Sequence, residues 1–319
     1  MRRHPPTLRA LLLPGAVVLG VLALPWLPAD SRIYYMQELT MGFLYAGLAQ
    51  SYDLVGGLLG YINLGHIVFF GLGAYTTGIL FNLGMPLIGG LAASILVAGA
   101  FAALISIPFF RLRGAYFSLA TFALVKLMEH VTDNLRDLTG GSSGLKILAG
   151  NRVLPMYYVT LALLAAAMAT SWAVGRSRLG LGMKSIREDE GVARDFGVPT
   201  TRIKAQALVI STVLPAALGG LFTWYINFIN PGEVFGLKLA LQPVAMAMLG
   251  GSGLVIGPLI GTAFLYGLEE LIWTRFEFLQ GAMLGLVVVL VGLFMPGGIA
   301  RLKGVERALE RLGLKEDDS

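Results

Sequence analysis

The amino-acid sequence predicts an all-α protein, a polytopic transmembrane helical bundle of about ten spans with both termini in the cytoplasm. Three observations predict this fold. The 319-residue chain is 56% hydrophobic and 13% charged, about half the charged fraction of an average soluble domain. Many windows of about 18 or more residues are nearly free of charge, which is long enough to cross a hydrocarbon core of about 30 Å. Basic residues gather in clusters between these windows, as topology signals do.

Apolar stretches bounded by glycine, proline and charged residues give the candidate spans, which are 8–28, 33–53, 64–83, 87–110, 114–132, 154–175, 205–228, 237–251, 255–273 and 278–295. The first is too long for a cleavable signal peptide. The span 237–251 is short, and the glycine-rich stretch 54–62 lies outside any span. Each is expected to be a half-helix or a re-entrant piece, which is tolerated only where protein or a cavity covers its backbone.

The basic clusters predict the orientation of these spans. They comprise Arg2, Arg3 and Arg9 before the first span, Arg111 and Arg113 after the fourth, a group within 176–204 after the sixth, and a group within 301–315 after the last. With ten spans all four clusters fall on one side, which the positive-inside rule makes cytoplasmic. The long loop 133–153 is then outside and the long loop 176–204 is inside.

The sequence also predicts the organisation of the chain and excludes several functions. We expect an N-terminal tail with the first span (1–30), a transmembrane domain (31–300) and a cytoplasmic C-terminal tail (301–319). Cysteine is absent, so disulfides, thiolate metal sites and cysteine nucleophiles are excluded. No G-x-x-x-x-G-K-[ST] loop occurs, so the chain does not hydrolyse ATP in the P-loop manner. The basic residues that give the net charge of +5 lie between spans, so this charge does not indicate nucleic-acid binding.

The segment "SIREDEGVARDFGVP" (185–199) is unusually polar for this chain. Ser185 and Glu188 have capping-box spacing, while Gly197 and Pro199 are typical of a helix end. The pattern predicts one helix over 185–197, outside the lipid. Gly191 would lie in its middle, where glycine costs about 1 kcal/mol relative to alanine, which suggests close approach by a partner. The segment is either a solvated loop helix or a docking element that a cytoplasmic partner moves.

The surrounding sequence "SRLGLGMKSIREDEGVARDFGVPTTRIK" resembles the cytoplasmic coupling loop of ATP-binding-cassette importer permeases of the branched-chain amino acid family. The matching residues are Ser177, Gly180, Ile186, Arg187, Asp189, Glu190, Ala193, Gly197 and Lys204. Leu181 stands where this family usually has arginine, and Ser185 stands where alanine is common.

Four further motifs carry the same resemblance over roughly residues 56–300. They are "INLGHIVFFGLGAYTTGIL" (62–80), "RLRGAYFSLATFAL" (111–124), "TGGSSGL" (139–145) and "LQPVAMAMLGGSGLVIGPLIGTAFL" (241–265). The second resembles the LivM-like, longer of the two permease types. Asn63 replaces the usual serine, and Ser143 replaces an acidic or amide residue. Gly257 and Gly261 form a GxxxG face that is expected to allow close helix packing.

The resemblance implies a permease subunit without chemistry of its own, in a bacterial cytoplasmic (inner) membrane. It would pass branched-chain or other small amino acids delivered by an external solute-binding protein. The other implied partners are a second permease subunit and ATPase subunits, which bind the ATP and Mg. The residues expected to couple to the ATPase are Ile186, Arg187, Glu190, Gly191, Ala193, Phe196 and Gly197. Among them, Arg187 and Glu190 are the expected polar anchors, and Ile186 and Phe196 the apolar ones.

Polar residues inside spans are candidates for the substrate pathway. They are Lys126, Glu129, His130, Thr121, Asn63 and Gln242. Lys126 is spaced to meet Glu129 and His130 on one helix face, so Lys126 and Glu129 either line the outer mouth or neutralise each other there. His66 is expected to be a structural hydrogen-bonding residue at a helix end.

Two other classes of protein fit the sequence less well. A self-contained, ion-coupled secondary transporter of a small polar solute would need coupling groups near the midplane and commonly shows inverted repeats, and neither is visible. An intramembrane enzyme would need catalytic motifs that the chain lacks. The sequence leaves open which amino acid or amide is carried and whether the permease core is a homodimer or a heterodimer.

Overall fold

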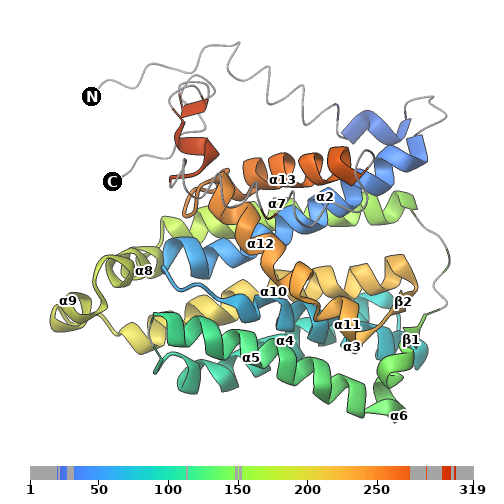
Figure 1. Ribbon diagram of the computed structural model, residues 1–319, viewed down its shortest axis with the longest axis horizontal. Coiled ribbons are helices and arrows are strands. Elements are labelled where there is room, and N and C mark those ends of the chain that lie inside the picture. The colour runs from blue at the N-terminus through green and yellow to red at the C-terminus, as the bar shows by residue number, and fades with distance from the viewer. Residues whose placement is uncertain are drawn as a thin grey trace.

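The protein is a bundle of long helices that run back and forth between two ends (Figure 1). A computed structural model describes residues 20, 22–26, 32–112, 114–147, 150, 153–273, 285, 297–302, 305 and 306. The last expected span, most of the first, and most of both terminal tails lie outside the described residues. So does Arg113.

The long helices are α2 (Arg32–Asp53), α3 (Ile67–Asn82), α4 (Leu87–Phe109), α5 (Ala115–Asn134), α7 (Val153–Gly175), α10 (Thr200–Ile226), α12 (Leu237–Gly250) and α13 (Gly257–Trp273). They correspond in order to the eight expected spans within the described residues. Within the described residues, five segments are long and apolar enough to cross a membrane by length and composition. The chain is therefore a polytopic helical membrane protein, and the total of ten spans stays a prediction.

Short elements connect the long helices at the two ends. They are η1 (Leu24–Trp26), η2 (Leu54–Leu58), η3 (Leu64–His66), α6 (Arg136–Thr139), η4 (Gly141–Ser143), β1 (Leu145–Lys146), α8 (Arg178–Glu188), α9 (Glu190–Asp195), β2 (Phe228–Ile229), α11 (Pro231–Val234) and η6 (Ile299–Arg301).

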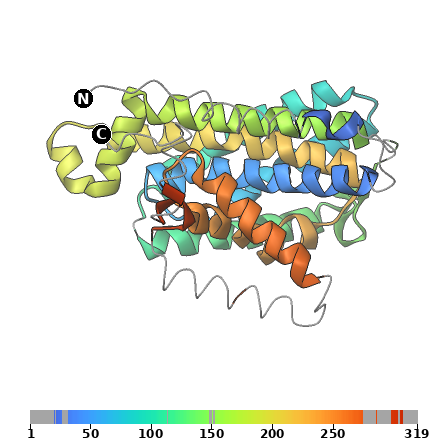
Figure 2. The same cartoon turned by 90° about the horizontal axis from the view of Figure 1, so that it is seen from above.

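Helix α10 lies at the centre of the described bundle, against α3, α4 and α2. Glycines bring the backbones of α3 and α10 together, because a Cβ on Gly73 would overlap the carbonyl oxygen of Ala216 and a Cβ on Gly219 would overlap that of Phe70. This is the small-residue packing typical of membrane helices. Figure 2 shows α2, α7 and α10 side by side along the bundle.

The close helix packing predicted from Gly257 and Gly261 is confirmed between α12 and α13. A Cβ on Gly261 would overlap the carbonyl oxygen of Met246, and a Cβ on Gly257 would overlap that of Gly251. Glycine is therefore required at these two positions by space and not by backbone conformation.

The two ends of the bundle carry different connections (Figure 1). At one end β1 pairs with β2 in antiparallel register, Leu145 opposite Ile229, and Asn82 donates to the carbonyl oxygen of Lys146 at 2.9 Å. Helices α8 and α9 lie at the opposite end. The ends of the eight described spans alternate as the predicted topology requires.

The stretch 54–62 begins as an extension of α2 and contains no separate half-helix. Helix α2 continues into the π-helical turn η2, whose residues Leu54, Val55 and Leu58 are buried. The chain then runs without helix to η3, and Tyr61 N donates to the carbonyl oxygen of Val55 at 3.1 Å. The short span 237–251 is lengthened by α11, so that the apolar segment covers Pro231–Gly250.

Candidate functional site

The polar segment after α7 forms two short helices, and the expectation of one helix over 185–197 is wrong. Ser177 caps α8 by accepting from Gly180 N at 3.2 Å. Asp189 then adopts an extended conformation (φ −157°, ψ 112°) and caps α9, accepting from Val192 N at 2.9 Å. Because side-chain caps satisfy the free N–H groups of a helix start, the segment bends at Asp189.

The supposed capping residue Ser185 lies inside α8, where its hydroxyl donates to the carbonyl oxygen of Gly182 at 2.9 Å. The predicted turn at Gly197 is confirmed, because this residue has φ +82°, in the region that favours glycine. Gly191 lies in the first turn of α9 and is exposed.

Glu190 is the centre of a polar network that ties α9 to the bundle. One carboxylate oxygen accepts from Lys204 Nζ at 2.9 Å and from Arg194 Nη2 at 3.0 Å, and the other accepts from the Tyr61 hydroxyl at 2.5 Å. The side chain of Lys204 is 2% exposed and that of Glu190 is 11% exposed. Charged groups this deeply buried require such pairing.

Lys204 extends this network to the end of α4. Its Nζ donates to the carbonyl oxygen of Phe110 at 3.2 Å and lies 5.1 Å from the ring centroid of Tyr61 and 5.5 Å from that of Phe110. The Phe117 ring stacks on Phe110 with centroids 5.3 Å apart. We call Glu190, Lys204, Tyr61 and Phe110 the lysine tie. It joins α9, α10, α4 and the link between η2 and η3.

A second contact, which we call the arginine tie, joins α8 to the ends of α2 and α12. Arg187 donates to the carbonyl oxygen of Gly57 in η2. Its guanidinium also lies beside Gly253, in the loop between α12 and α13. Asp53 completes the contact, because both of its oxygens accept from Gly253 N, at 3.0 and 2.9 Å.

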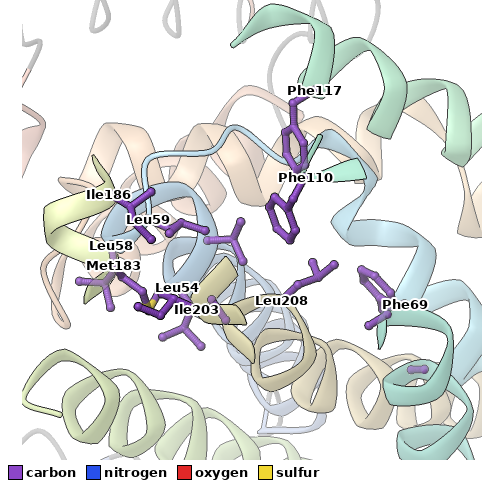
Figure 3. Close-up of a cluster of buried hydrophobic side chains, with 14 of the residues drawn as sticks. Leu54, Leu58, Leu59, Phe69, Phe110, Phe117, Met183, Ile186, Ile203 and Leu208 are labelled. Carbon is purple, nitrogen blue, oxygen red and sulfur yellow. The ribbon is translucent and has the colours of Figure 1, made fainter. Parts of the chain in front are cut away.

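Apolar contacts between the two ties fasten α8 to the bundle (Figure 3). Ile186 is 4% exposed and belongs to a cluster with Leu54, Leu58 and Ile203. Ala193 of α9 is buried in the same cluster. Ile186 is therefore a core residue and is not available as an apolar anchor for a partner.

The outward surface of α9 is formed by other residues. Phe196 is 85% exposed and Val192 is 50% exposed. We call these two side chains the α9 tip. Of the two apolar anchors expected from the sequence, only Phe196 lies on the surface. The two polar anchors, Arg187 and Glu190, make their described contacts with the bundle itself.

The pathway candidates fall into separate groups. Lys126 and Glu129 form an ion pair of 2.7 Å on α5, with side chains 44% and 20% exposed, and His130 is exposed on the same helix. Thr121 accepts from Leu64 N at 3.2 Å and Asn63 accepts from Gly65 N at 3.0 Å, so both lie around η3.

Gln242 on α12 forms the third group. It donates to Glu269 of α13 at 2.6 Å, and Glu269 also pairs with Lys238. His66 is buried with its Nε2 3.1 Å from the Ser51 hydroxyl. In the part of the chain that the structure describes, no group of three His, Asp or Glu residues could hold a metal ion.

Sequence reasoning named Lys204 only as a motif match and overlooked Tyr61 and Phe110. A signal for Lys204 was present, because Ala207, Leu208 and Ser211 follow it at helical spacing and form a buried face with it. A lysine on the apolar face of a span end predicts a buried partner. No comparable local signal marks Tyr61.

Comparisons with known proteins agree with this architecture. The family model described as "Branched-chain amino acid transport system / permease component" matches residues 34–292. The chain is similar to the high-affinity branched-chain amino acid transport system permease protein LivM of Salmonella typhimurium, with 28% identity over 82% of this chain and 68% of the relative. LivM of Escherichia coli is also 28% identical, over 89% of this chain and 73% of the relative.

A shorter permease is similar as well. LivH of Escherichia coli is 24% identical over 88% of this chain and 99% of the relative. No solved structure matches.

Proposed function

The chain belongs to the family of permease components of branched-chain amino acid transport systems, and we propose that its α9 tip is the docking point for an ATPase subunit. As a member of this family it is a non-catalytic, integral membrane component of a bacterial ATP-binding-cassette transporter. The ATP is bound by ATPase partner subunits. What we propose is the place and manner of the coupling.

The observation that carries the proposal is the position of Phe196. This large aromatic side chain is 85% exposed on a short helix that projects from the end of the bundle (Figure 1). Phenylalanine is among the aromatic residues that are enriched at the cores of protein interfaces. Val192 lies one helical turn before Phe196, so the two side chains can enter one pocket of a partner.

The two ties give the docked helix a mechanical connection to the spans. A displacement of α9 would be transmitted through the Glu190–Lys204 contact to α10 and to the end of α4. A displacement of α8 would be transmitted through the contacts of Arg187 with Gly57 and Gly253 to α2, α12 and α13. Movement of an ATPase subunit would therefore reach spans on both sides of the bundle. Arg187 and Glu190 act in this proposal as positioning residues behind the docking surface.

The remaining partners are inferred from the family. We propose a second, similar permease subunit as the other half of the membrane core and an external solute-binding protein that delivers branched-chain or other small amino acids. For the substrate pathway, we propose that Lys126, Glu129 and His130 lie toward the outer mouth. Asn63 and Thr121 would then lie toward the cytoplasmic end, and Gln242 near the outer end of α12. This assignment follows from the position of each residue in the predicted topology.

The test is affinity purification of the tagged chain from its native membrane in mild detergent, with mass spectrometry of the accompanying proteins. We expect a P-loop ATPase and a second permease with the unaltered chain. Phe196→Asp should lose the ATPase and retain the second permease. The matched control is Leu83→Asp, which alters a residue that is 77% exposed at the opposite end of the bundle.

Equal recovery of the ATPase with both variants would refute the docking point. Movement of solute by the purified chain alone, without ATP, would refute the importer mechanism and favour the secondary transporter.

A further inference from the structure

A groove opens on the surface of the bundle between α4, α8 and α10. Its cavity volume is about 730 Å³. It is lined by Ala103, Ser106, Ile107, Leu179, Ala205, Gln206, Val209 and Ile210. Most of these side chains are apolar, and Ile107 is 58% exposed. The groove therefore presents apolar surface outside the protein core, in segments that cross the membrane.

The groove lies near the end of the bundle that carries α8 and α9. On α10 its lining begins one residue after Lys204, which belongs to the lysine tie. On α4 the lining ends three residues before Phe110, in the same tie. In the predicted orientation this is the cytoplasmic leaflet. Lipid is the solvent at this depth, and an apolar groove there suits an acyl chain.

Three arginines lie within four residues, along the chain, of a lining residue at the cytoplasmic end of the groove. Arg202 precedes Gln206 by one turn of α10, and Val209 and Val213 continue the same helix face. Arg178 directly precedes Leu179, and Arg111 follows Ile107 by four residues. All three arginines are exposed. None forms an ion pair with an acidic residue of the described chain.

We propose that the groove is a binding site for an anionic phospholipid of the cytoplasmic leaflet. One acyl chain would lie on Ile107, Val209 and Ile210, and the phosphate group would meet Arg202 and Arg178, with Arg111 alongside. Basic pockets between transmembrane helices on the cytoplasmic side bind anionic headgroups in this manner. Arginine suits phosphate because its planar fork donates two parallel hydrogen bonds.

The charge pattern favours an anionic lipid over a zwitterionic one. A groove for any acyl chain needs only the apolar wall, whereas the arginines that adjoin its cytoplasmic end along the chain add attraction for negative charge. Gln206 and Ser106 are the polar side chains of the lining, and both are neutral. The bound lipid would touch α8 through Leu179, so it would contact the segment that carries the coupling helices.

The experiment uses the intact transporter reconstituted in vesicles that contain phosphatidylglycerol with a photoreactive diazirine on the half of one acyl chain nearest the headgroup. A parallel reconstitution uses phosphatidylcholine with the same chain. After irradiation, labelled peptides are identified by mass spectrometry. We expect labelling of α4 and α10 within the groove, at least several-fold stronger with phosphatidylglycerol.

Two variants test the two halves of the site. Val209→Trp fills the groove and should abolish the labelling, whereas Val213→Trp, one turn further along the same lipid-facing stripe, should leave it unchanged. Arg178→Gln combined with Arg202→Gln should lower the labelling by phosphatidylglycerol to the level seen with phosphatidylcholine. The control is Arg136→Gln with Lys146→Gln, which removes the same charge from two exposed residues at the opposite end of the bundle.

Equal labelling by the two lipids in the unaltered transporter would overturn the proposal, and so would unchanged labelling in Val209→Trp. Cross-links from the groove to another protein chain would show that a subunit covers it instead. Labelling requires neither ATP nor solute, so its failure is distinguishable from a failure of the proposed ATPase docking.

Discussion

At the scale of single residues, Glu190 shows how a charged residue can be part of a coupling segment without facing the partner. The sequence marks it correctly as part of a matching motif. Its carboxylate, however, points to Lys204 and Tyr61. The motif match cannot reveal this orientation, because the partners lie 14 and 129 positions away in the chain.

Breaking the lysine tie should therefore weaken the fold as well as transport. Glu190→Gln removes the charge that compensates Lys204, and a buried charge left without its partner costs about 3–5 kcal/mol. The loss should be toward the lower figure, because the Tyr61 hydroxyl and the carbonyl oxygen of Phe110 stay in reach. We expect a lower melting temperature of the purified permease and reduced ATP-driven uptake.

The matched control for this substitution is Glu188→Gln, at an exposed acidic residue two positions earlier. It should leave both quantities near those of the unaltered protein. Equal melting temperatures for the two variants would show that the Glu190 pair contributes nothing to stability.

Gly191 provides the second prediction at this scale. The sequence predicted a position in the middle of a helix, where the cost of glycine would need a compensating contact. The structure instead places Gly191 in the first turn of α9, where it is exposed. A Cβ there would meet only Asp189 Oδ1, at 3.1 Å. Gly191→Ala should therefore insert and transport normally. Gly191→Trp should insert normally but lose ATP-driven uptake, because its ring would obstruct the docked ATPase. Normal uptake by the Trp variant would mean that no partner approaches α9 closely.

At the scale of elements, the long spans were predictable and the coupling segment was not. An apolar run of about 20 residues has one stable solution in lipid, since every backbone group must bond within the helix. In water the segment after α7 has several candidate caps, and the side chains of Ser177, Asp189 and Ser185 compete for backbone partners. The capping box at Ser185 and Glu188 was one local solution. The contacts of Ile186 and Arg187 with the bundle favour the other two caps.

The cap at Asp189 can be tested directly. Replacing an N-cap carboxylate by alanine costs about 1 kcal/mol, whereas asparagine retains the capping oxygen. Asp189→Ala should therefore raise the hydrogen-exchange rates of the α9 amides, measured by mass spectrometry on the purified protein. Asp189→Asn should leave these rates nearly unchanged. Equal exchange in the two variants would mean that the bend between α8 and α9 does not depend on this cap.

The contact between α3 and α10 supports a further prediction about elements. Gly73→Val places side-chain atoms where the backbone of Ala216 lies, and Gly219→Val does the same toward Phe70. Because packed helices cannot absorb such an overlap without separating, both variants should fail to accumulate as folded protein, as judged by detergent size-exclusion profiles. Gly99→Val on α4 meets no atom within 4 Å and should accumulate normally. Normal accumulation of the Gly73 variant would show that the two helices are not in backbone contact.

At the scale of the whole molecule, the predicted topology and the structure group the same loops at each end of the bundle. The charge clusters predicted which loops share a side, and the lysine and arginine ties bring together the loops expected on the cytoplasmic side. The contacts themselves were not predictable from the sequence. They join residues such as Tyr61 and Glu190, or Asp53 and Gly253, whose proximity depends on how the spans pack and not on any local pattern.

The absolute orientation is the last prediction, and the composition makes it straightforward to measure. The chain contains no cysteine, so a single introduced thiol is the only target for a maleimide. Leu83→Cys and Asp137→Cys place exposed thiols at the end with β1 and β2, and Leu112→Cys and Asp195→Cys place them at the end with α8 and α9. In intact cells with a permeable outer envelope, a membrane-impermeant maleimide should label the first pair and not the second. Opening the inner membrane should make all four reactive. The reverse pattern would place α9 outside the cell, where no ATPase subunit could reach the α9 tip. Labelling of one member of a pair without the other would contradict the arrangement of the spans themselves.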